Sequence, residues 1–490
     1  MNTKSYLYLI SSLIVGYVIT FIIVDRYFSA NADMVNSALA WKEVGEHGLS
    51  VLKLWQPTVD NWYLAIYPVH FLIFYVCGDP SIFMLKVMSV SQTVLTSLVA
   101  SLIVYQVTKK KSSFLLIIYL SCLSYFAYVI GFVHHLFSHN AINLYGLICV
   151  LIYIRWQKSF IATTVICVIS LAAAVSDPWY VVAYLLPLAL YSIYAQIKKE
   201  LGGLTAVIQF SMFIITIVVF FSGIVQKLMY VPVTHFELAS LDVIKNNIKW
   251  FFWDYGRIVN LFFVEKNAAY VISAILFIML TIFVLIKNLD RSINILLLLS
   301  ILGISSTFII GNPGKAQYSA RFLANVIYLV PAIILINYKR NILVVLIPAL
   351  ILSLLSSAWS HFSHGRNNAD SDSLQMIQFM RDNSLNFGYG DYWGLRANDA
   401  TWRSGGDVVI RPVIFDKDTG MIKWRRKHSQ SFSTWYGPYQ GKAFIAMTEV
   451  GETCHDIKKC FEGVQKQYGK PDVILKYKKI TFFVYDKFNK

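Results

Sequence analysis

Long runs of apolar residues recur along this chain. An α-helix needs about 20 such residues to cross a hydrocarbon core of ~30 Å. Hydrophobic residues make up 57% of the 490 residues and charged residues only 14%, whereas a soluble domain carries about 25% charge. A single large soluble core is therefore excluded. We predict a polytopic α-helical membrane protein with about eleven spanning helices, at residues 5–24, 82–107, 114–133, 140–154, 160–175, 179–195, 204–223, 268–286, 293–310, 323–337 and 341–358.

Basic residues collect in alternate connections between these runs. They are Lys109, Lys110, Lys111, Arg155, Lys158, Lys198, Lys199, Lys287, Arg291, Lys339 and Arg340. Loops rich in Lys and Arg stay on the cytoplasmic side of a membrane. We therefore predict a membrane protein with a cytoplasmic N-terminus and residues 359–490 on the opposite, outer side. The same loops explain the excess of 43 Lys and Arg over 27 Asp and Glu, so no nucleic-acid partner is expected.

Residues 62–76 form a further apolar run, which we place in the membrane interface because an additional span here would move the basic loops to the other side. If the run does span, the C-terminal part moves inside. The chain is expected to divide into a transmembrane catalytic module, 1–358, with outer loops 25–81 and 224–267, and an extracytoplasmic soluble domain, 359–490.

Two aspartates in outer segments are candidate catalytic residues. Asp33 stands where a helix would start in the first outer loop, so it either caps that helix or acts as a base at the membrane interface. Asp177 precedes a proline, which is an ordinary helix start, but it also places a second carboxylate at membrane depth beside Trp179, a candidate substrate contact.

Lys86, His135 and His139 are candidate binding residues. Lys86 lies near the outer end of the second span, where an ionisable group is costly, and it either holds a lipid phosphate or extends to the headgroups. His135 and His139 have a spacing that can bind zinc. Because no third ligand accompanies them, we predict no metal and expect contacts to a substrate headgroup or sugar, with interfacial packing as the alternative.

Two further outer segments are basic. Residues 311–321 are polar and glycine-rich, and Lys315 and Arg321 in this turn either bind a donor phosphate or contact anionic headgroups. Arginine suits a phosphate because its planar fork donates two parallel hydrogen bonds. Residues 244–264 mix basic and aromatic side chains, which indicates a helix lying in the interface. It would either anchor its loop or cover a lipid-linked donor.

The order of these features resembles the GT-C class of membrane glycosyltransferases. The resemblance rests on the early acidic residue Asp33, an interfacial helix starting at Tyr67 and Pro68, a Gly-Asp-Pro turn at 78–80 and a second span beginning at Met84. It implies a polyprenyl-phosphate sugar as donor and Asp33 as general base or acceptor anchor. Tyr67 is a further candidate substrate contact.

The resemblance has two departures from the family pattern. Tyr318 and Arg321 resemble the Arg-Tyr region that contacts the donor phosphate in several GT-C families, with the order reversed. Asp33 stands alone after Ala32, where many members carry an acidic pair. This departure argues against a metal-dependent mechanism, and we expect no cofactor.

The polar C-terminal part is predicted to be a small α/β domain. Helices are expected at 373–381 and 456–468, and strands at 408–414, 443–448, 473–477 and 480–485. Residues 387–394 join glycines to aromatic rings. Tyr392 and Trp393 in this segment would stack on a sugar, or the aromatic rings would form a buried core. Cys454 and Cys460 would pair in an oxidising compartment.

The length and the outer C-terminal domain resemble the serotype-converting O-antigen glucosyltransferases. This resemblance implies a bacterial inner-membrane protein with residues 359–490 in the periplasm. It also implies inverting transfer of one sugar, with glucose as the expected sugar, from undecaprenyl phosphate to an O-antigen or another extracytoplasmic glycan or glycolipid. Expected partners are this donor, the acceptor, membrane lipid, and a flippase with a polyprenyl-phosphate glycosyltransferase. The alternatives are an O-antigen polymerase or ligase, and a lipid or polysaccharide transporter, which should show internal repeats and mid-membrane charges.

Overall fold

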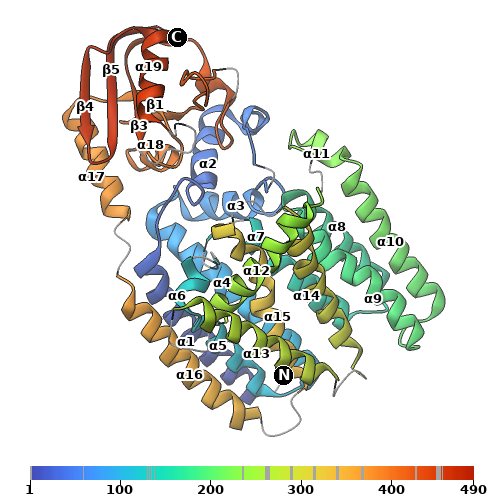
Figure 1. Cartoon of the computed structure of the whole chain (residues 1–490). Helices are drawn as coiled ribbons and strands as arrows, with labels where there is room; N and C mark the ends of the chain where they lie inside the picture. Colours follow the sequence, from blue (N-terminus) through green and yellow to red (C-terminus); the bar gives the residue numbers. More distant parts are fainter. Residues whose placement is uncertain are drawn as a thin grey trace.

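The chain is a helical bundle with a β-sheet domain at one end. The computed structural model describes residues 3–58, 60–129, 131, 133, 135–136, 138–233, 237–259, 265–286, 291–312, 316–337, 342–365, 369–424, 427–448, 454 and 456–489. Figure 1 shows the sheet, in red, above the bundle, and the N-terminus toward the opposite end.

The bundle contains helices of very different lengths. In chain order they are α1 (Thr3–Tyr27), α2 (Asn36–His47), η1 (Leu49–Leu54), α3 (Tyr67–Cys77), α4 (Ile82–Thr108), η2 (Lys111–Phe114), α5 (Leu115–Ser121), α6 (Tyr125–Val129), α7 (Ser138–Arg155), α8 (Phe160–Ser176), the π-helical turn η3 (Val181–Leu185), α9 (Leu186–Ile197), α10 (Gly203–Phe221), α11 (Ile224–Leu228), α12 (Leu241–Ile258), α13 (Asn267–Ile286), α14 (Ser292–Ile310), η4 (Ala316–Leu323), α15 (Ala324–Asn337) and α16 (Ile342–Ser363).

Six helices among the described residues are long and apolar enough to cross a membrane. They are α1, α4, α10, α13, α14 and the segment Ala320–Asn337. These helices give the chain the character of a multi-pass membrane protein, but the predicted count of about eleven spans is not confirmed. Among the predicted segments, α8 has 17 residues, and η3 and α9 together form one apolar helix, Val181–Ile197. Both are shorter than the roughly 20 residues that a full crossing needs.

The predicted span 114–133 is wrong as a single helix. The structure divides it into η2, α5 and α6, with a break at residues 122–124. The Leu123 carbonyl oxygen, left free by the break, accepts a hydrogen bond of 3.0 Å from Ser357 Oγ and lies 3.2 Å from His361 Nε2, both on α16. A distant helix therefore satisfies backbone groups that lipid could not, and hydropathy does not report such a partner.

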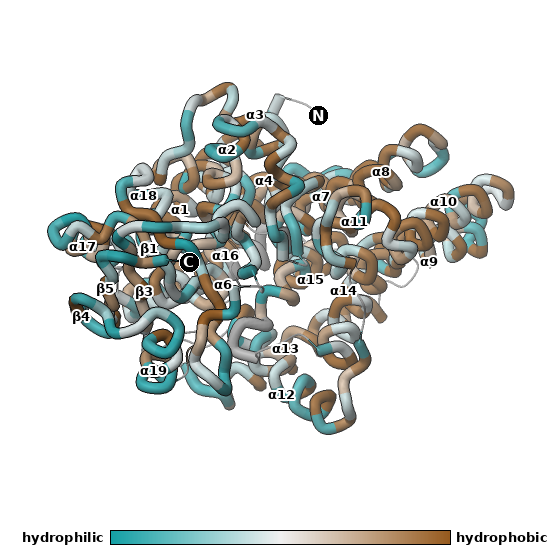
Figure 2. The backbone as a smooth tube through the Cα atoms, turned by 90° about the horizontal axis from the view of Figure 1, so that it is seen from above, coloured by the Kyte–Doolittle hydropathy of each residue, from teal (hydrophilic) through white to brown (hydrophobic). Residues whose placement is uncertain are grey.

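The interior of the bundle is formed by α4 and α15. Most residues in their apolar stretches are buried, whereas only 28% of those in α1 and in α10 are buried. Exposed side chains on α1 include Ile14, Val18 and Ile22. An apolar helix face that no protein covers suits lipid. In Figure 2 the apolar colour is concentrated over α8, α9 and α10, and the sheet domain carries much of the polar colour.

Two glycines allow close helix packing. A Cβ atom on Gly256 of α12 would stand 1.8 Å from the Tyr270 carbonyl oxygen on α13, and one on Gly303 of α14 would stand 2.0 Å from the Val182 carbonyl oxygen in η3. Small residues let helix backbones approach in membranes. The basic, aromatic helix α12 is therefore packed directly against α13.

The C-terminal part is a mixed α/β domain, as predicted. It contains α17 (Ala369–Asp382), β1 (Phe387–Gly390), α18 (Ala397–Arg403), β2 (Val409–Pro412), η5 (Ser433–Tyr436), β3 (Gln440–Thr448), α19 (Ile457–Tyr468), β4 (Val473–Tyr477) and β5 (Ile480–Asn489). The sheet order is β2-β1-β3-β5-β4. β1 runs parallel to β2 and β3, and β5 runs antiparallel to β3 and β4. Cys454 and Cys460 are joined by a disulfide at the start of α19.

β1 was not predicted as a strand. Its glycines suggested a flexible sugar-stacking segment, but Tyr389 is fully buried in the sheet. A Cβ atom on Gly388 would stand 2.3 Å from the Phe444 carbonyl oxygen on β3. These glycines therefore serve close strand packing, and the aromatic residues of β1 belong to the core of the domain.

Candidate active site

The sheet domain docks on the loop of residues 25–81, which precedes α4. Gln56 N donates to the Ser431 carbonyl at 2.8 Å, Gln430 N donates to the Gln56 carbonyl at 2.6 Å, and Trp55 pairs with Phe432 in an antiparallel bridge. Arg396 donates to Ser29 Oγ at 2.8 Å and to the Ala30 carbonyl at 2.9 Å. The loop and the domain therefore meet at the same end of the bundle.

Asp33 lies in this junction. It precedes α2, whose N-cap residue, Val35, makes no side-chain capping bond. The side chain of Asn31 instead accepts a hydrogen bond from Met34 N at 2.9 Å. The Asp33 carboxylate accepts a hydrogen bond from Gln430 Nε2 of the sheet domain. The Asp33 side chain therefore does not cap α2. Its carboxylate instead faces the interface with the sheet domain.

The surroundings of Asp33 make it more basic than a free aspartate. Burial disfavours the charged form and raises its pKa to about 6, and the nearby charge of Asp60 acts in the same direction. The Gln430 hydrogen bond and the charges of Arg321 and His428 partly oppose this shift. A carboxylate with such a pKa is suited to general base catalysis near neutral pH.

A second set of acidic groups surrounds His139 at the start of α7. Its Nδ1 is hydrogen-bonded to Asp177, and its Nε2 lies 3.6 Å from Asp60 Oδ2. The Asp177 side chain is completely buried, and its other oxygen accepts a hydrogen bond of 3.1 Å from Trp179 N. Asp177 thus fixes the histidine ring and starts the following helix, and Asp60 links His139 electrostatically to Asp33.

Aromatic and basic residues from η4 adjoin this histidine. The Phe322 ring stacks on Trp179 at 4.3 Å and meets His139 edge-on at 4.9 Å, and Arg321 Cζ lies 5.0 Å from the Phe322 ring centre. Arg321 Nε and both polar atoms of the Asn325 amide are buried without hydrogen-bond partners among the described residues. Such buried polar atoms indicate a place where a ligand would supply the missing partners.

Other predicted residues have partners other than the Asp33 carboxylate. Lys86 Nζ forms an ion pair of 2.7 Å with Asp25, and the Tyr67 hydroxyl donates to Asn36 Oδ1 at 2.6 Å. Lys315 lies outside the described residues, and only the backbone of Tyr318 is described. Their role in donor binding therefore remains a prediction.

The remaining predicted substrate contacts differ in exposure. His135 is buried beside Asn140, which donates to the His135 carbonyl at 2.7 Å. The Tyr392 hydroxyl donates to Gln430 Oε1 at 2.6 Å, and Trp393 beside it is 45% exposed. Of this pair, Trp393 presents the open aromatic surface.

The sequence analysis missed Asp60, Asn325 and Gln430 as site residues. Asp60 had a weak signal, because it precedes the aromatic pair at the start of the interfacial run. Asn325 is an amide inside an apolar segment, which is unusual enough to be a candidate. Nothing in the sequence near Gln430 indicates that it reaches a residue 397 positions away.

Comparison with solved structures identifies the fold of the chain. No protein-family model and no curated protein matches the chain. Among solved structures, the oligosaccharyltransferase of Archaeoglobus fulgidus, determined as a complex with zinc and sulfate, matches with a TM-score of 0.50 and 12% sequence identity. The match covers 97% of this chain and 73% of that chain. The chain therefore has a GT-C-like fold.

Proposed function

We propose that this chain is an inverting glycosyltransferase that moves a single sugar, glucose, from undecaprenyl phosphate to an O-antigen or another extracytoplasmic glycan or lipid. The GT-C-like fold supports the enzyme class. The observation that carries the proposal is the carboxylate of Asp33, whose burial raises its pKa to about 6 and which interacts with the charge of Arg321.

Asp33 is the general base of the proposed reaction. It removes the proton from an acceptor hydroxyl while that oxygen attacks the anomeric carbon of the donor sugar. The bond between this carbon and the phosphate oxygen breaks, and its electron pair leaves with the phosphate. Attack opposite the leaving group inverts the configuration. Burial stabilises the neutral Asp33 that this step produces.

Arg321 and Asn325 form the proposed phosphate site, with Lys315 and Tyr318 as further candidates. Arg321 Nε and the Asn325 amide, which have no hydrogen-bond partner within the described part of the chain, would donate to phosphate oxygens. Such charge-assisted hydrogen bonds strengthen as the leaving group gains charge. Lys86 is a less direct candidate, since Asp25 already neutralises it.

Asp177 and His139 act as a pair in this proposal. Asp177 accepts a hydrogen bond from the N–H group at His139 Nδ1. The ring is thereby held with Nε2 directed toward Asp60. His139 with Trp179 and Phe322 then forms a wall beside the phosphate site that would contact the sugar. Asp177 is thus a positioning residue for His139, which differs from the catalytic role expected from the sequence.

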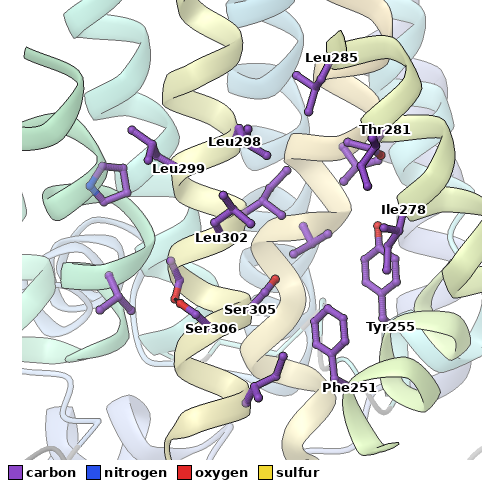
Figure 3. Close-up of a pocket in the computed structure, with 18 of the residues that line it drawn as sticks. Phe251, Tyr255, Ile278, Thr281, Leu285, Leu298, Leu299, Leu302, Ser305 and Ser306 are labelled. Atoms are coloured by element: carbon purple, nitrogen blue, oxygen red, sulfur yellow. Dashed lines mark hydrogen bonds between the residues drawn. The ribbon is translucent and has the colours of Figure 1, made fainter. Parts of the chain in front are cut away.

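An apolar cavity of about 530 Å³ supports a lipid-linked donor. It lies between α9, α12, α13, α14 and α15, and Figure 3 shows Phe251, Ile278, Leu298 and Leu302 pointing into it. Val326 on α15 also lines it, and five helical residues rise roughly 8 Å. A phosphate on Arg321 would therefore leave its polyprenyl chain at the mouth of this cavity.

Three side chains of α2 lie close enough together to hold a metal ion. Within the described part of the chain, the ligand atoms of Glu43, Glu46 and His47 are the three that approach within 4.8 Å of one another, and these residues lie on α2. His139, Asp60 and Asp33 do not meet that condition.

Transfer of a whole oligosaccharide is the second candidate function. It is favoured by one observation, the likeness to an oligosaccharyltransferase. Donors that carry one sugar or a preassembled glycan on the same lipid separate the two candidates. A preference for the longer donor would replace single-sugar transfer.

We also propose the placement of the parts. Residues 1–358 form the catalytic module in a bacterial inner membrane, with the N-terminus in the cytoplasm, and residues 359–490 form the periplasmic domain. The contacts between the first outer loop and residues 430–432 support a shared compartment for these two parts.

The base is tested with purified protein in proteoliposomes that contain undecaprenyl-phosphate glucose and an O-antigen acceptor. We expect Asp33→Asn to insert and melt normally and to transfer no measurable sugar. Asp79→Asn is the matched control, because Asp79 is an exposed carboxylate of the same loop, and it should keep wild-type activity. Normal transfer by Asp33→Asn would remove this residue from the mechanism.

A further inference from the structure

Gln430 uses every polar group that it has. Its backbone N–H donates to Gln56, and its carbonyl accepts from Asn398 Nδ2 at 2.8 Å. Its side-chain Oε1 accepts from the Tyr392 hydroxyl at 2.6 Å, and its Nε2 donates to Asp33 Oδ1. The side chain is buried, and the backbone has φ of +57°, a strained value for a residue with a side chain. Such complete anchoring fixes one orientation of the amide.

The orientation of this amide follows from its neighbours. An ionised carboxylate only accepts hydrogen bonds, so the amide atom that faces Asp33 must be the NH₂ group. The Tyr392 hydroxyl then donates to the opposite oxygen, and the His428 ring stacks on Tyr392 at 4.4 Å. Tyr392 therefore holds the amide in the orientation that serves the base.

We infer that Gln430 is a positioning residue through which the docked sheet domain completes the catalytic centre. This inference rests on the proposed role of Asp33 as base. Gln430 binds Oδ1 of Asp33, while Oδ2 accepts no hydrogen bond from the described residues. The carboxylate is thus held by one oxygen and presents the other to the acceptor hydroxyl.

The inference explains why the domain and the loop share so many contacts. Gln430, Tyr392 and Asn398 all belong to the sheet domain, and Asp33 and Gln56 belong to the first outer loop. Without the docked domain the Asp33 side chain would rotate freely, because α2 does not use it as a cap. The base would then lose its fixed direction, and the transition state would lose the benefit of a prepositioned group.

Gln430→Met tests this role, since methionine keeps the length of the side chain and removes both hydrogen bonds. We expect kcat to fall by about 10- to 100-fold, as for loss of a hydrogen bond to a charged group, while KM changes by less than about twofold. Gln440→Met, at an exposed position of β3, is the control and should leave both constants unchanged.

Tyr392→Phe removes one hydroxyl and is the milder variant. It should lower kcat by about 2- to 10-fold in the wild-type background. It should have no further effect in Gln430→Met, because Tyr392 acts on Asp33 only through the Gln430 amide. Melting temperature and protease resistance show whether Gln430→Met folds. If it does not fold, the kcat of Tyr392→Phe tests the inference, and a wild-type kcat in that variant would contradict it.

Three outcomes would overturn the inference: wild-type kcat in a folded Gln430→Met, additive effects of the two variants, or a rise in kcat, which would mean that Gln430 shields the base. Asp33→Asn is measured in parallel. If Asp33→Asn is inactive and Gln430→Met is normal, the positioning role alone fails, and if Asp33→Asn is active, the proposed base fails.

Discussion

The expected basicity of Asp33 comes from its burial, which disfavours the charged carboxylate and raises its pKa. A free aspartate has a pKa near 3.8, whereas burial beside Asp60 raises the pKa of Asp33 to about 6. The shift makes the carboxylate a stronger base and leaves it ionised at pH 7. The same environment therefore sets both the strength of Asp33 as a base and the pH below which Asp33 is protonated and can no longer act as one.

The pH dependence of transfer should report this group. Because the base must be ionised, kcat should be constant above pH 7 and fall as the pH drops through about 6. Asp60→Asn removes a negative charge that raises the pKa, so the midpoint should move to lower pH. The measurement is kcat between pH 4.5 and 8 in proteoliposomes, with pH values chosen to span about 1.5 units on each side of the midpoint. A midpoint that stays in place would exclude Asp60 as a cause.

Asp177 is expected to act through His139. Asp177→Asn keeps the shape of the side chain, but its amide NH₂ cannot accept the proton of His139 Nδ1. The ring must then carry its proton on Nε2, facing Asp60. We expect kcat to fall by about 10- to 100-fold, as for other groups that orient a functional histidine, with melting temperature little changed. Full activity would show that Asp177 only starts the helix that follows it.

Among the helices, the contact of α12 with α13 depends on one missing side chain. Gly256→Ala would force these helices apart, because the new Cβ atom would overlap the Tyr270 carbonyl. We expect a loss of about 1–3 kcal/mol in unfolding free energy. Gly45→Ala in α2, where nothing lies within 4 Å, should instead raise stability by about 0.5–1 kcal/mol. Thermal melting in detergent compares the two, and equal effects would contradict the close packing.

The helices show where sequence reasoning succeeds and where it stops. The runs at 82–107, 160–175 and 293–310 end within two residues of α4, α8 and α14, because hydropathy is a local property. The break between α5 and α6 depends on Ser357 and His361, more than 230 positions away. The candidate site follows the same rule: Asp33 was found from its position in the loop, whereas Gln430 is visible only in three dimensions.

For the whole molecule, the sharpest prediction concerns sidedness. The loop of residues 25–81 touches the sheet domain, so both must share one compartment. Alkaline phosphatase fused after Lys490 should be active, since it works only in the periplasm, and a fusion after Lys199 between α9 and α10 should be inactive. An inactive fusion after Lys490 would place the proposed donor and base in the cytoplasm.

The apolar cavity beside α12 and α15 determines how the rate of sugar transfer should be measured. Leu190, Ile282 and Leu302 line this cavity and are also exposed on the outside of the bundle, so its wall is shared with the surrounding acyl chains. A donor that enters there diffuses in two dimensions and never dissolves in water. Turnover should then follow the mole fraction of donor among the lipids, and adding empty vesicles that do not fuse should leave it unchanged.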